Sequence, residues 1–383
     1  MMATEIIELD LRTAPDVVRV RDNVQAVLVV VRDAGRPVDL VRRQRPHDGM
    51  LSTRDIVASS RKKIVAAHRD DRAARPLLSI SVIVCTRERP DDLARCLESL
   101  AGVRNGGHEV IVVDNAPASD RTAAVAARFD VRYVLEPERG LDRARNAGVH
   151  AATGDIVAFV DDDVVVTPPW VEAIAGCFGD AKVGCATGLV LPLELETAAQ
   201  EEFEIYCQHR RDFRRRVYSS NDVRASAAGV VGIGANMAYR RSLLIEVGGF
   251  DVRLDAGTAT QSGGETDMFA RVLDAGWRIV YEPDAQVWHR HRRTDRELRA
   301  CVFGYGVGVF GMLTKRLVEL RDPGALVTAG RWLIGPIVKA MAAKIARRPA
   351  PRWNVVLAET VGTAFGPFCF LYERWRVRRA GFR

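Results

Sequence analysis

The acidic triplet Asp161-Asp162-Asp163 is the group of residues in this sequence best suited to chemistry. It follows the apolar run VAFV, so the carboxylates come at the end of a predicted buried strand. Carboxylates this close repel one another unless they share a cation. Hard oxygen ligands at the first and third positions suit Mg²⁺ or Mn²⁺, with substrate phosphates completing the coordination. The triplet alone is equally compatible with an acidic turn that carries no metal.

Three further polar residues fall at the ends of predicted strands. Thr86 ends LLSISVIVCT, Asp114 lies near the end of HEVIVVDNA, and Glu136 lies near the end of VRYVLEP. In open α/β sheets the carboxyl ends of parallel strands meet at one edge, and ligands bind there. We therefore expect these side chains to gather beside the acidic triplet.

The elements that must position these residues alternate regularly along the chain. Apolar runs typical of buried strands cover 77–86, 108–116, 131–137 and 155–163, and helices are expected from Pro90, over 121–128 and over 141–152. This β-α-β-α-β-α-β order predicts a doubly wound α/β sheet.

The chain divides into four predicted regions. Residues 1–58 are predicted to form a small β-containing module, in which Val24–Val31 and Val38–Val41 predict a hairpin. The other three regions are a charged linker or helix (59–76), the α/β domain (77–300) and a helical region (301–383).

The composition is that of an ordinary globular protein that favours anionic partners. The 383 residues are 48% hydrophobic and 27% charged, with a net charge of +7. Phosphorylated ligands and anionic membranes fit this charge, whereas nucleic acid is not expected because no zinc-finger or base-stacking motif accompanies it. The seven cysteines form no CxxC pair and predict reduced core residues in a cytoplasmic protein. The N-terminus has no apolar core of a signal peptide.

Five segments, taken together, resemble the family 2 glycosyltransferases of the GT-A fold. They are ISVIVCTRERPDDLARCLESL, VIVVDNAP, ERGLDRARNAGVHAATGDIVAFVDDD, GANMAYRRSLLIEVGGFD and GGETDMFARVLDAGWRIVYEPDAQVWHRHRR, which cover roughly residues 78–300 in the family's order. The resemblance implies a GT-A fold, of an actinobacterial type with an extra N-terminal module. It also implies inverting transfer from a UDP-, GDP- or dTDP-sugar with Mg²⁺ or Mn²⁺.

The resemblance also implies roles for individual residues. Asp161 and Asp163 match the family's DXD metal site, with Asp163 the expected direct ligand, and Asp162 is expected at the ribose or in a structural contact. The remaining positions expected to bind the donor are Thr86, Arg87, Asp114, Arg139, Gly140, Arg143 and Asn146.

The general base is harder to assign because the sequence departs from the family's Glu-Asp motif. In the segment Gly263–Phe269, Glu265 falls on the base position if Asp267 starts the following helix, and the acidic partner that precedes the base is then replaced by Gly264. We expect Glu265 to be the base and Asp267 its supporting carboxylate, with the reverse assignment left open. Both could instead cap the helix.

Two other segments belong to the expected site. In VWHRHRR, His289 is expected to reach the metal or the diphosphate, and His291 is a weaker candidate, although a solvated basic turn would also explain them. The glycine-rich stretch 229–236 lacks the Lys-Ser/Thr of a P-loop, and we expect it to line the acceptor or donor sugar by close approach of its backbone.

The C-terminal region alternates apolar and basic stretches. This pattern predicts peripheral contact with the inner face of a membrane. The alternatives are helices that pack on the catalytic domain or that form a homodimer interface. Residues 354–372 are the most apolar, but Glu359, Gly366 and Pro367 interrupt them, so no transmembrane helix is expected. The acceptor could be lipid-linked, a polysaccharide or a small molecule.

Two other functions compete with sugar transfer. A nucleotidyltransferase would carry a glycine-rich signature after the first strand, where this chain has Cys85-Thr86-Arg87-Glu88-Arg89. A non-catalytic scaffold that has lost its base is the other alternative, because of the altered Glu-Asp motif.

Overall fold

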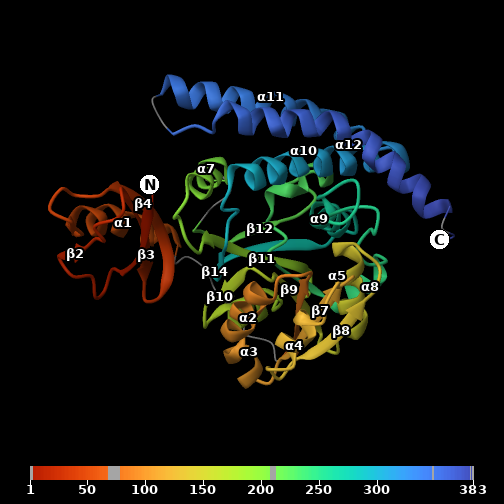
Figure 1. The fold of residues 1–383 in the computed structure, drawn as a ribbon, viewed down its shortest axis with the longest axis horizontal. Coiled ribbons are helices and arrows are strands. Elements are labelled where there is room, and N and C mark those ends of the chain that lie inside the picture. The colour runs from red at the N-terminus through yellow and green to blue at the C-terminus, as the bar shows by residue number, and fades with distance from the viewer. Residues whose placement is uncertain (1–2, 68–77, 208–212, 347–348, 380, 382–383) are drawn as a thin grey trace.

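The strands predicted around the acidic triplet lie side by side and form one half of a mixed sheet (Figure 1). In this computed structural model the described residues are 3–67, 78–207, 213–346, 349–379 and 381. The sheet has nine strands in the order β10-β14-β11-β13-β9-β6-β7-β8, with β12 paired to β14. The four predicted strands are β6 (Ile80–Thr86), β7 (Glu109–Asn115), β8 (Arg132–Glu136) and β9 (Ile156–Asp161).

These four strands run parallel, with the register that the site requires. Cys85 on β6 lies opposite Asp161 on β9, and Thr86 lies opposite Asp114 on β7. Their carboxyl ends therefore meet at one edge, as expected. The other strands of the sheet are β10 (Val164–Val166), β11 (Val183–Pro192), β12 (Arg216–Tyr218), β13 (Asn236–Arg240) and β14 (Arg278–His289).

Helices cover both faces of the sheet, because its strands are apolar on both sides. One face is covered by α2 (Pro90–Ser99), α3 (Ala101–Asn105), α4 (Arg121–Ala126) and α6 (Trp170–Cys177). The other is covered by α5 (Leu141–Ala151), α8 (Arg241–Glu246) and α9 (Gly264–Asp274). The predicted α/β class with a doubly wound parallel core is confirmed.

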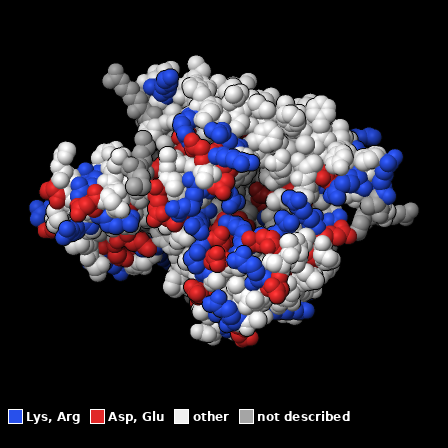
Figure 2. All heavy atoms as spheres, viewed as in Figure 1, with Lys and Arg blue, Asp and Glu red and all other residues white. Residues whose placement is uncertain are grey.

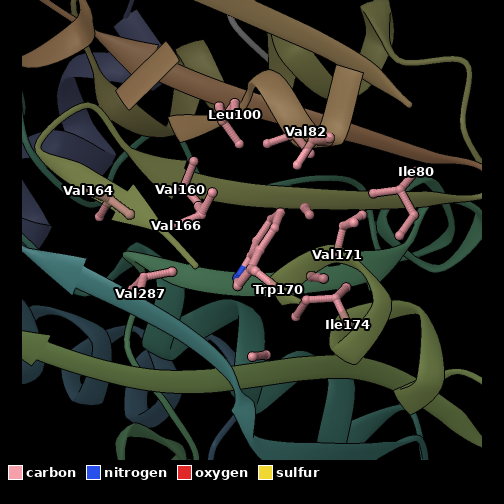
Figure 3. Close-up of a cluster of buried hydrophobic side chains, with 14 of the residues drawn as sticks. Ile80, Val82, Leu100, Val160, Val164, Val166, Trp170, Val171, Ile174 and Val287 are labelled. Atoms are coloured by element: carbon pink, nitrogen blue, oxygen red, sulfur yellow. The ribbon is translucent and has the colours of Figure 1, made fainter. Parts of the chain in front are cut away.

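A single tryptophan anchors the first of these two cores. Trp170 of α6 is fully buried among Val82, Val160 and Ile174 (Figure 3). Its indole Nε1 donates to Oδ1 of Asn236 over 2.9 Å, so the polar edge of the ring is satisfied in an apolar environment. This contact fixes the end of the glycine-rich stretch 229–236 against the sheet.

The N-terminal module forms a small separate sheet that contacts the edge of the main domain. The predicted hairpin is present as β3 (Ala26–Asp33) and β4 (Arg36–Gln44), and β1 (Thr4–Asp10) pairs parallel to β3. The module is completed by β2 (Val17–Arg19), β5 (Met50–Ser52) and α1 (Arg54–Ala67). The helix α1 includes the first part of the predicted linker, and the remaining linker residues 68–76 lie outside the described residues. Arg42 pairs with Glu201 of the main domain at 2.6 Å.

Long helices form the C-terminal region and lie over the catalytic domain (Figure 1). They are α10 (Asp295–Glu319), α11 (Gly324–Ile345) and α12 (Trp353–Arg379), and α10 contacts the shorter α7 (Ala198–Cys207). A 3₁₀ segment, η2 (Ala225–Val230), is the remaining helical element in the described part of the chain.

Among the described residues, α10, α11 and α12 are each long and apolar enough to cross a membrane by length and composition alone. The expectation that none of them spans a membrane stays a prediction. The helix α12 runs unbroken through Glu359, Gly366 and Pro367. Glu359 is compatible with an apolar helix because it is buried and accepts a hydrogen bond from the Tyr206 hydroxyl over 2.6 Å.

Candidate active site

The acidic triplet lies where the parallel core of the sheet meets its antiparallel extension. Asp161 ends β9, and β10 begins directly after the triplet and pairs with the end of β14, so that Val164 lies opposite His289. This pairing brings the histidine beside the carboxylates although it is more than a hundred residues away in the sequence.

Asp161, Asp163 and His289 form a cluster suited to a divalent cation. One candidate ligand atom from each residue lies within 4.8 Å of the other two, and Nε2 of His289 is 3.2 Å from Oδ1 of Asp163. Two carboxylates and one imidazole are a donor set that Mn²⁺ or Mg²⁺ accepts, with open positions left for phosphate oxygens. The residues therefore fit the metal that the sequence predicts.

Burial and neighbouring charges shift the pKa values of all three residues in this cluster. Burial would raise the pKa of Asp163, but the charge of His289, helped by Arg89, holds that pKa well below its usual range. Burial also opposes protonation of His289, yet the neighbouring Asp163 raises the histidine pKa. Burial and the charge of Asp163 together raise the pKa of Asp161.

His291 supports His289 from behind and is itself held by Glu204. The Nδ1 atoms of the two histidines are 3.2 Å apart, and Nε2 of His291 is 2.6 Å from Oε1 of Glu204. Glu204 can accept the proton of His291 Nε2, whose Nδ1 then accepts from Nδ1 of His289. Nε2 of His289 carries a proton in its pairing with Asp163, and a bound metal would displace that proton and take Nε2 as a ligand.

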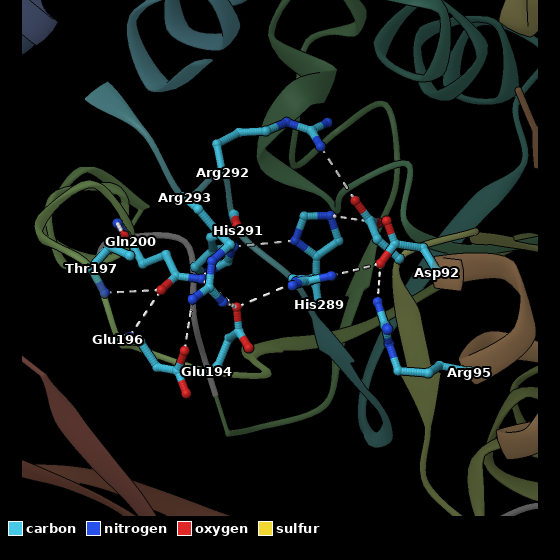
Figure 4. A network of polar contacts seen from close by, with 12 residues as sticks. Asp92, Arg95, Glu194, Glu196, Thr197, Gln200, His289, His291, Arg292 and Arg293 are labelled. Carbon is cyan, nitrogen blue, oxygen red and sulfur yellow. Dashed lines mark hydrogen bonds and ion pairs between the residues drawn. The ribbon is translucent and has the colours of Figure 1, made fainter. Parts of the chain in front are cut away.

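The side chains of residues 289–293 point to two places. His289, His291 and Arg292 line the cavity, whereas Arg290 pairs with Asp92 at 2.9 Å and Arg293 pairs with Glu194 and Glu196 (Figure 4). The basic segment is thus fixed by acidic residues on two sides.

The side chain of Asp162 makes different contacts from those of Asp161 and Asp163. It accepts hydrogen bonds from the Thr86 hydroxyl over 2.8 Å and from Arg89 over 2.6 Å, and Arg89 also reaches Asp163 at 2.9 Å. Burial raises the pKa of Asp162 to about 7 although Arg89 opposes this. Thr86 and Arg89 therefore hold Asp162 in place, and a contact of Asp162 with the donor ribose stays a prediction.

A cavity of about 620 Å³ opens beside the cluster. Asp161 and His289 line one part of its wall, and Glu265 lines another. The glycine-rich stretch lines it as expected, from Gly229 to Ala235, and the helix α10 contributes Cys301 and Tyr305. The cavity thus joins two of the predicted metal ligands, Asp161 and His289, to the predicted base, and Asp163 lies behind its wall beside them.

Glu265 lies in the first turn of α9, next to a buried arginine and two other carboxylates. Burial and the charge of Asp255 raise the pKa of Glu265 to about 7, although Arg145 opposes the shift. Arg145 donates to Asp142 and to Asp255, both at 2.7 Å. With one cation among three carboxylates, a proton held at Glu265 near neutral pH is physically reasonable.

The unexpected Gly264 has a clear structural cause. A Cβ atom at this position would lie 2.1 Å from Oδ2 of Asp142, which is fully buried in α5. Burial and the charge of Asp255 raise the pKa of Asp142 despite Arg145. The carboxylate of Asp142 thus occupies the space that a side chain at position 264 would need.

Asp267 lies on the side of α9 that faces away from the cavity. It is 1% exposed and pairs with Lys315 of α10 at 2.8 Å and with Arg271 at 2.9 Å. Lys315 also pairs with Asp251 at 2.7 Å. Among the described residues, the carboxylate that raises the pKa of Glu265 most is that of Asp255 and not that of Asp267.

The residues expected at the donor are arranged around the same edge with different surroundings. Arg87 and Arg139 are exposed, whereas Asp114 is buried and accepts from the Tyr133 hydroxyl over 2.9 Å. Arg143 pairs with Glu138 at 2.9 Å. Gly140 adopts a φ of +148° and its amide donates to Asn115 over 2.9 Å.

Asn146 has a structural role in the fold. Its side chain donates to the carbonyl of Phe250 over 2.9 Å and accepts from the Phe250 amide over 2.7 Å. It thereby fixes the loop that follows α8, and it is not among the residues that line the described cavity.

Comparison with known proteins agrees with this geometry. Residues 81–248, which contain the triplet and most of the sheet, match the model of glycosyl transferase family 2. The chain carries a family 2 glycosyltransferase domain. The resemblance inferred from the sequence motifs is confirmed.

Relatives of this glycosyltransferase domain extend beyond the matched residues. The pre-mycofactocin glycosyltransferase of Mycobacterium tuberculosis is 29% identical over 78% of this chain, which spans 62% of that relative's length. The glucosyl-dolichyl phosphate glucuronosyltransferase of Haloferax volcanii is 28% identical over 65% of this chain and 80% of the relative. A mannosyltransferase from Pyrobaculum calidifontis, solved with GDP-Man and Mn²⁺, shares the fold with a TM-score of 0.53 and 20% identity, over 78% of this chain and 88% of that one.

Sequence analysis of the glycosyltransferase domain missed four residues that shape its site. Arg89 lies three residues after the end of the first strand, and Arg145 was passed over although it lies in the same helical segment as Arg143 and Asn146. Asp142 precedes Arg145 by three residues, a spacing that brings two helical side chains together. Asp255 had no such local signal, since it reaches Arg145 from a loop more than a hundred residues away.

Proposed function

We propose that this protein is an inverting glycosyltransferase that moves a sugar from a nucleotide-diphosphate sugar to an acceptor hydroxyl. The observation that carries this proposal is the single cavity that joins Asp161 and His289 to Glu265. A donor diphosphate would bind at Asp161 and His289, and an acceptor hydroxyl would bind at Glu265. The sugar to be transferred would then lie between them. This is the geometry that in-line displacement needs.

Asp161, Asp163 and His289 would hold a divalent cation and with it the diphosphate. A bound Mg²⁺ or Mn²⁺ would act as a Lewis acid that stabilises the departing nucleoside diphosphate. Arg89 and Arg292 add positive charge at Asp163, with Arg292 at 3.5 Å. The protein's own contribution is therefore to orient the ligand atoms and to neutralise the charge of the leaving group.

Glu265 would take the proton from the acceptor hydroxyl. A base works best when its pKa lies near the pH at which the enzyme operates, because it must be ionised and still bind a proton well. The pKa of Glu265, raised to about 7, meets this requirement. Arg145 and Asp255 would position the carboxylate, and Asp267 would support α9 from behind through Lys315.

The assignment of Thr86, Arg87, Asp114, Arg139, Gly140 and Arg143 to donor binding remains part of this proposal, whereas Asn146 is left out because Phe250 binds both polar ends of its side chain. The archaeal mannosyltransferase of the same fold was solved with GDP-Man and Mn²⁺, which supports a nucleotide sugar as donor class; UDP-, GDP- and dTDP-sugars are all candidates. The haloarchaeal relative is named for a dolichyl phosphate acceptor. We accordingly include a lipid-linked acceptor beside polysaccharides and small molecules, with the reaction at the cytoplasmic side of the membrane.

The test is the release of nucleoside diphosphate from a panel of UDP-, GDP- and dTDP-sugars with Mn²⁺. We expect release with at least one donor, loss of release on chelation, and loss in Asp163→Asn. The exposed Asp180→Asn is the matched control and should behave as the wild-type protein. Nucleotide binding with no release from any donor would refute the proposal.

A further inference from the structure

The outer face of α11 and α12 is apolar over its whole length. Among the described residues, sixteen of the 26 exposed large hydrophobic side chains lie on these two helices, eight on each. On α12 they recur every three or four residues and so form one helical stripe: Leu357, Val361, Phe365, Phe368, Tyr372 and Trp375. Ile334, Val338, Met341 and Ile345 do the same on α11.

This surface is far larger than the scattered exposed hydrophobics of a soluble monomer. In Figure 2 the part of the molecule over α11 and α12 is mostly uncharged, in contrast to the mixed charges of the catalytic domain below it. Large contiguous apolar patches mark sites where another molecule or a membrane docks.

The exposed charged residues described on these two helices are all positive. The helix α11 contains no acidic residue, and the two in α12, Glu359 and Glu373, are each 3% exposed. Arg331, Lys344, Arg376, Arg378 and Arg379 are all exposed. A face that is apolar and bordered by cations is complementary to an anionic lipid surface.

Polar contacts along the inner side hold α12 flat against the catalytic domain. Near its start Glu359 accepts from Tyr206, and near its end Glu373 accepts from the amide of Ala259 over 2.8 Å. In between, Gly362 and Gly366 bring its backbone close to that of α10. A helix bound at both ends to the domain cannot cross a bilayer without breaking these contacts, so it would lie in the membrane plane.

We propose that the outer face of α11 and α12 docks flat on an anionic lipid bilayer as a peripheral membrane anchor. A second copy of the chain is a poorer occupant, since an isologous contact would bring two faces of the same positive sign together with no exposed acid on either helix to pair with.

The docking face lies close to the cavity. The helix α10 lines the cavity with Cys301 and Tyr305 and contacts α12 on its other side. The hydroxyl of Thr328 on α11 also lies 3.0 Å from that of Ser226 in η2, which borders the glycine-rich wall. If the proposed function holds, a membrane-borne acceptor would be within short reach of Glu265. Vesicle binding itself does not depend on that function.

The experiment is co-sedimentation of the full chain, without donor, with two kinds of vesicle. We expect vesicles of equal parts phosphatidylglycerol and phosphatidylcholine to bind about tenfold more tightly than phosphatidylcholine alone, and the binding to weaken in high salt. The variant Ile334→Glu/Phe368→Glu should lose this binding. Its melting temperature should stay unchanged, because the two side chains are 62% and 72% exposed.

Ile245→Glu is the matched control, since Ile245 is 54% exposed on α8 of the catalytic domain. It should bind vesicles as the wild-type chain does. Equal vesicle binding by the double variant would overturn the proposal. So would a dimer in solution that the double variant converts to a monomer without any vesicle binding, or cellular protein that stays in the membrane after alkaline carbonate extraction, which would indicate helices that span it.

Discussion

The substitution Glu265→Gln tests the base assignment through two independent properties of one residue. Glutamine keeps the size of the side chain and can donate or accept hydrogen bonds, but it cannot take a proton from an acceptor hydroxyl. We expect turnover to fall by about 10²–10⁴-fold, the usual contribution of a general base, while affinity for the donor is retained. In the wild-type enzyme, turnover should rise with pH as Glu265 ionises around its pKa of about 7.

The same substitution should stabilise the fold, and the size of the effect follows from the pKa. Folding raises the pKa of Glu265 from 4.5 to about 7, because burial and Asp255 disfavour the ionised form. Each unit is worth about 1.4 kcal/mol, so ionised Glu265 destabilises the folded state by about 3 kcal/mol. Both states are ionised above pH 7 and the full cost applies there. Both are protonated well below pH 4.5, where the cost disappears.

Denaturant unfolding of both proteins at several pH values measures this difference. The variant should be more stable than the wild-type protein by about 3 kcal/mol at pH 8 and by less than about 1 kcal/mol at pH 5. The exposed Glu246→Gln on α8 serves as control and should stay within about 0.5 kcal/mol of the wild-type protein at both values. Equal stability at pH 8 would mean that Glu265 is not held in the buried, acid-rich environment described above. Full turnover by Glu265→Gln would refute its function as the base.

Three other substitutions test the metal site and the supports of α9. Asp163→Asn should abolish the rise in melting temperature that Mn²⁺ and a nucleoside diphosphate cause together, measured by thermal shift; an unchanged rise would exclude it as a ligand. Asp267→Asn should cost about 1–3 kcal/mol in denaturant unfolding because the buried Lys315 then keeps only Asp251 as an acidic partner, and donor affinity measured by calorimetry should persist; lost binding with unchanged stability would contradict the supporting role. Gly264→Ala should destabilise by about 1–3 kcal/mol because its Cβ would meet Asp142, and the same change should cost much less in an Asp142→Ala background; additive effects of the two would show that they do not share the space.

The parallel core of the fold could be predicted because its signals are local. Each of its four strands is an apolar run followed by a polar residue, and the register of β6 against β7 and β9 then brings Thr86, Asp114 and Asp161 to one edge. The antiparallel extension that holds His289 next to Asp163 has no such signal. It depends on the pairing of β10 with β14, which only the complete sheet determines.

In the C-terminal region, local sequence signals were present but pointed away from the long helices that form there. Glu359, Gly366 and Pro367 each disfavour a continuous apolar helix when they are considered alone. In the fold, one oxygen of Glu359 accepts a hydrogen bond from Tyr206, and the missing side chain of Gly366 lets α12 approach the backbone of α10. Features that interrupt the pattern in the sequence are the ones that attach the helix to the domain.

The departure from the family's acidic pair has the same kind of explanation, and it bears on whether the domain has lost its base. A glycine before Glu265 would suggest a decayed motif if the carboxylate that normally precedes the base had simply disappeared. Instead, the carboxylate of Asp142 fills the space at Gly264 from a different helix, and Arg145 ties it to Asp255 next to Glu265. Burying two acids and an arginine is expensive unless each has a partner, so a domain that no longer needed its base would be expected to replace them with apolar residues. The surroundings of Glu265 therefore favour a catalytic domain over a scaffold, and the Glu265→Gln measurements distinguish the two.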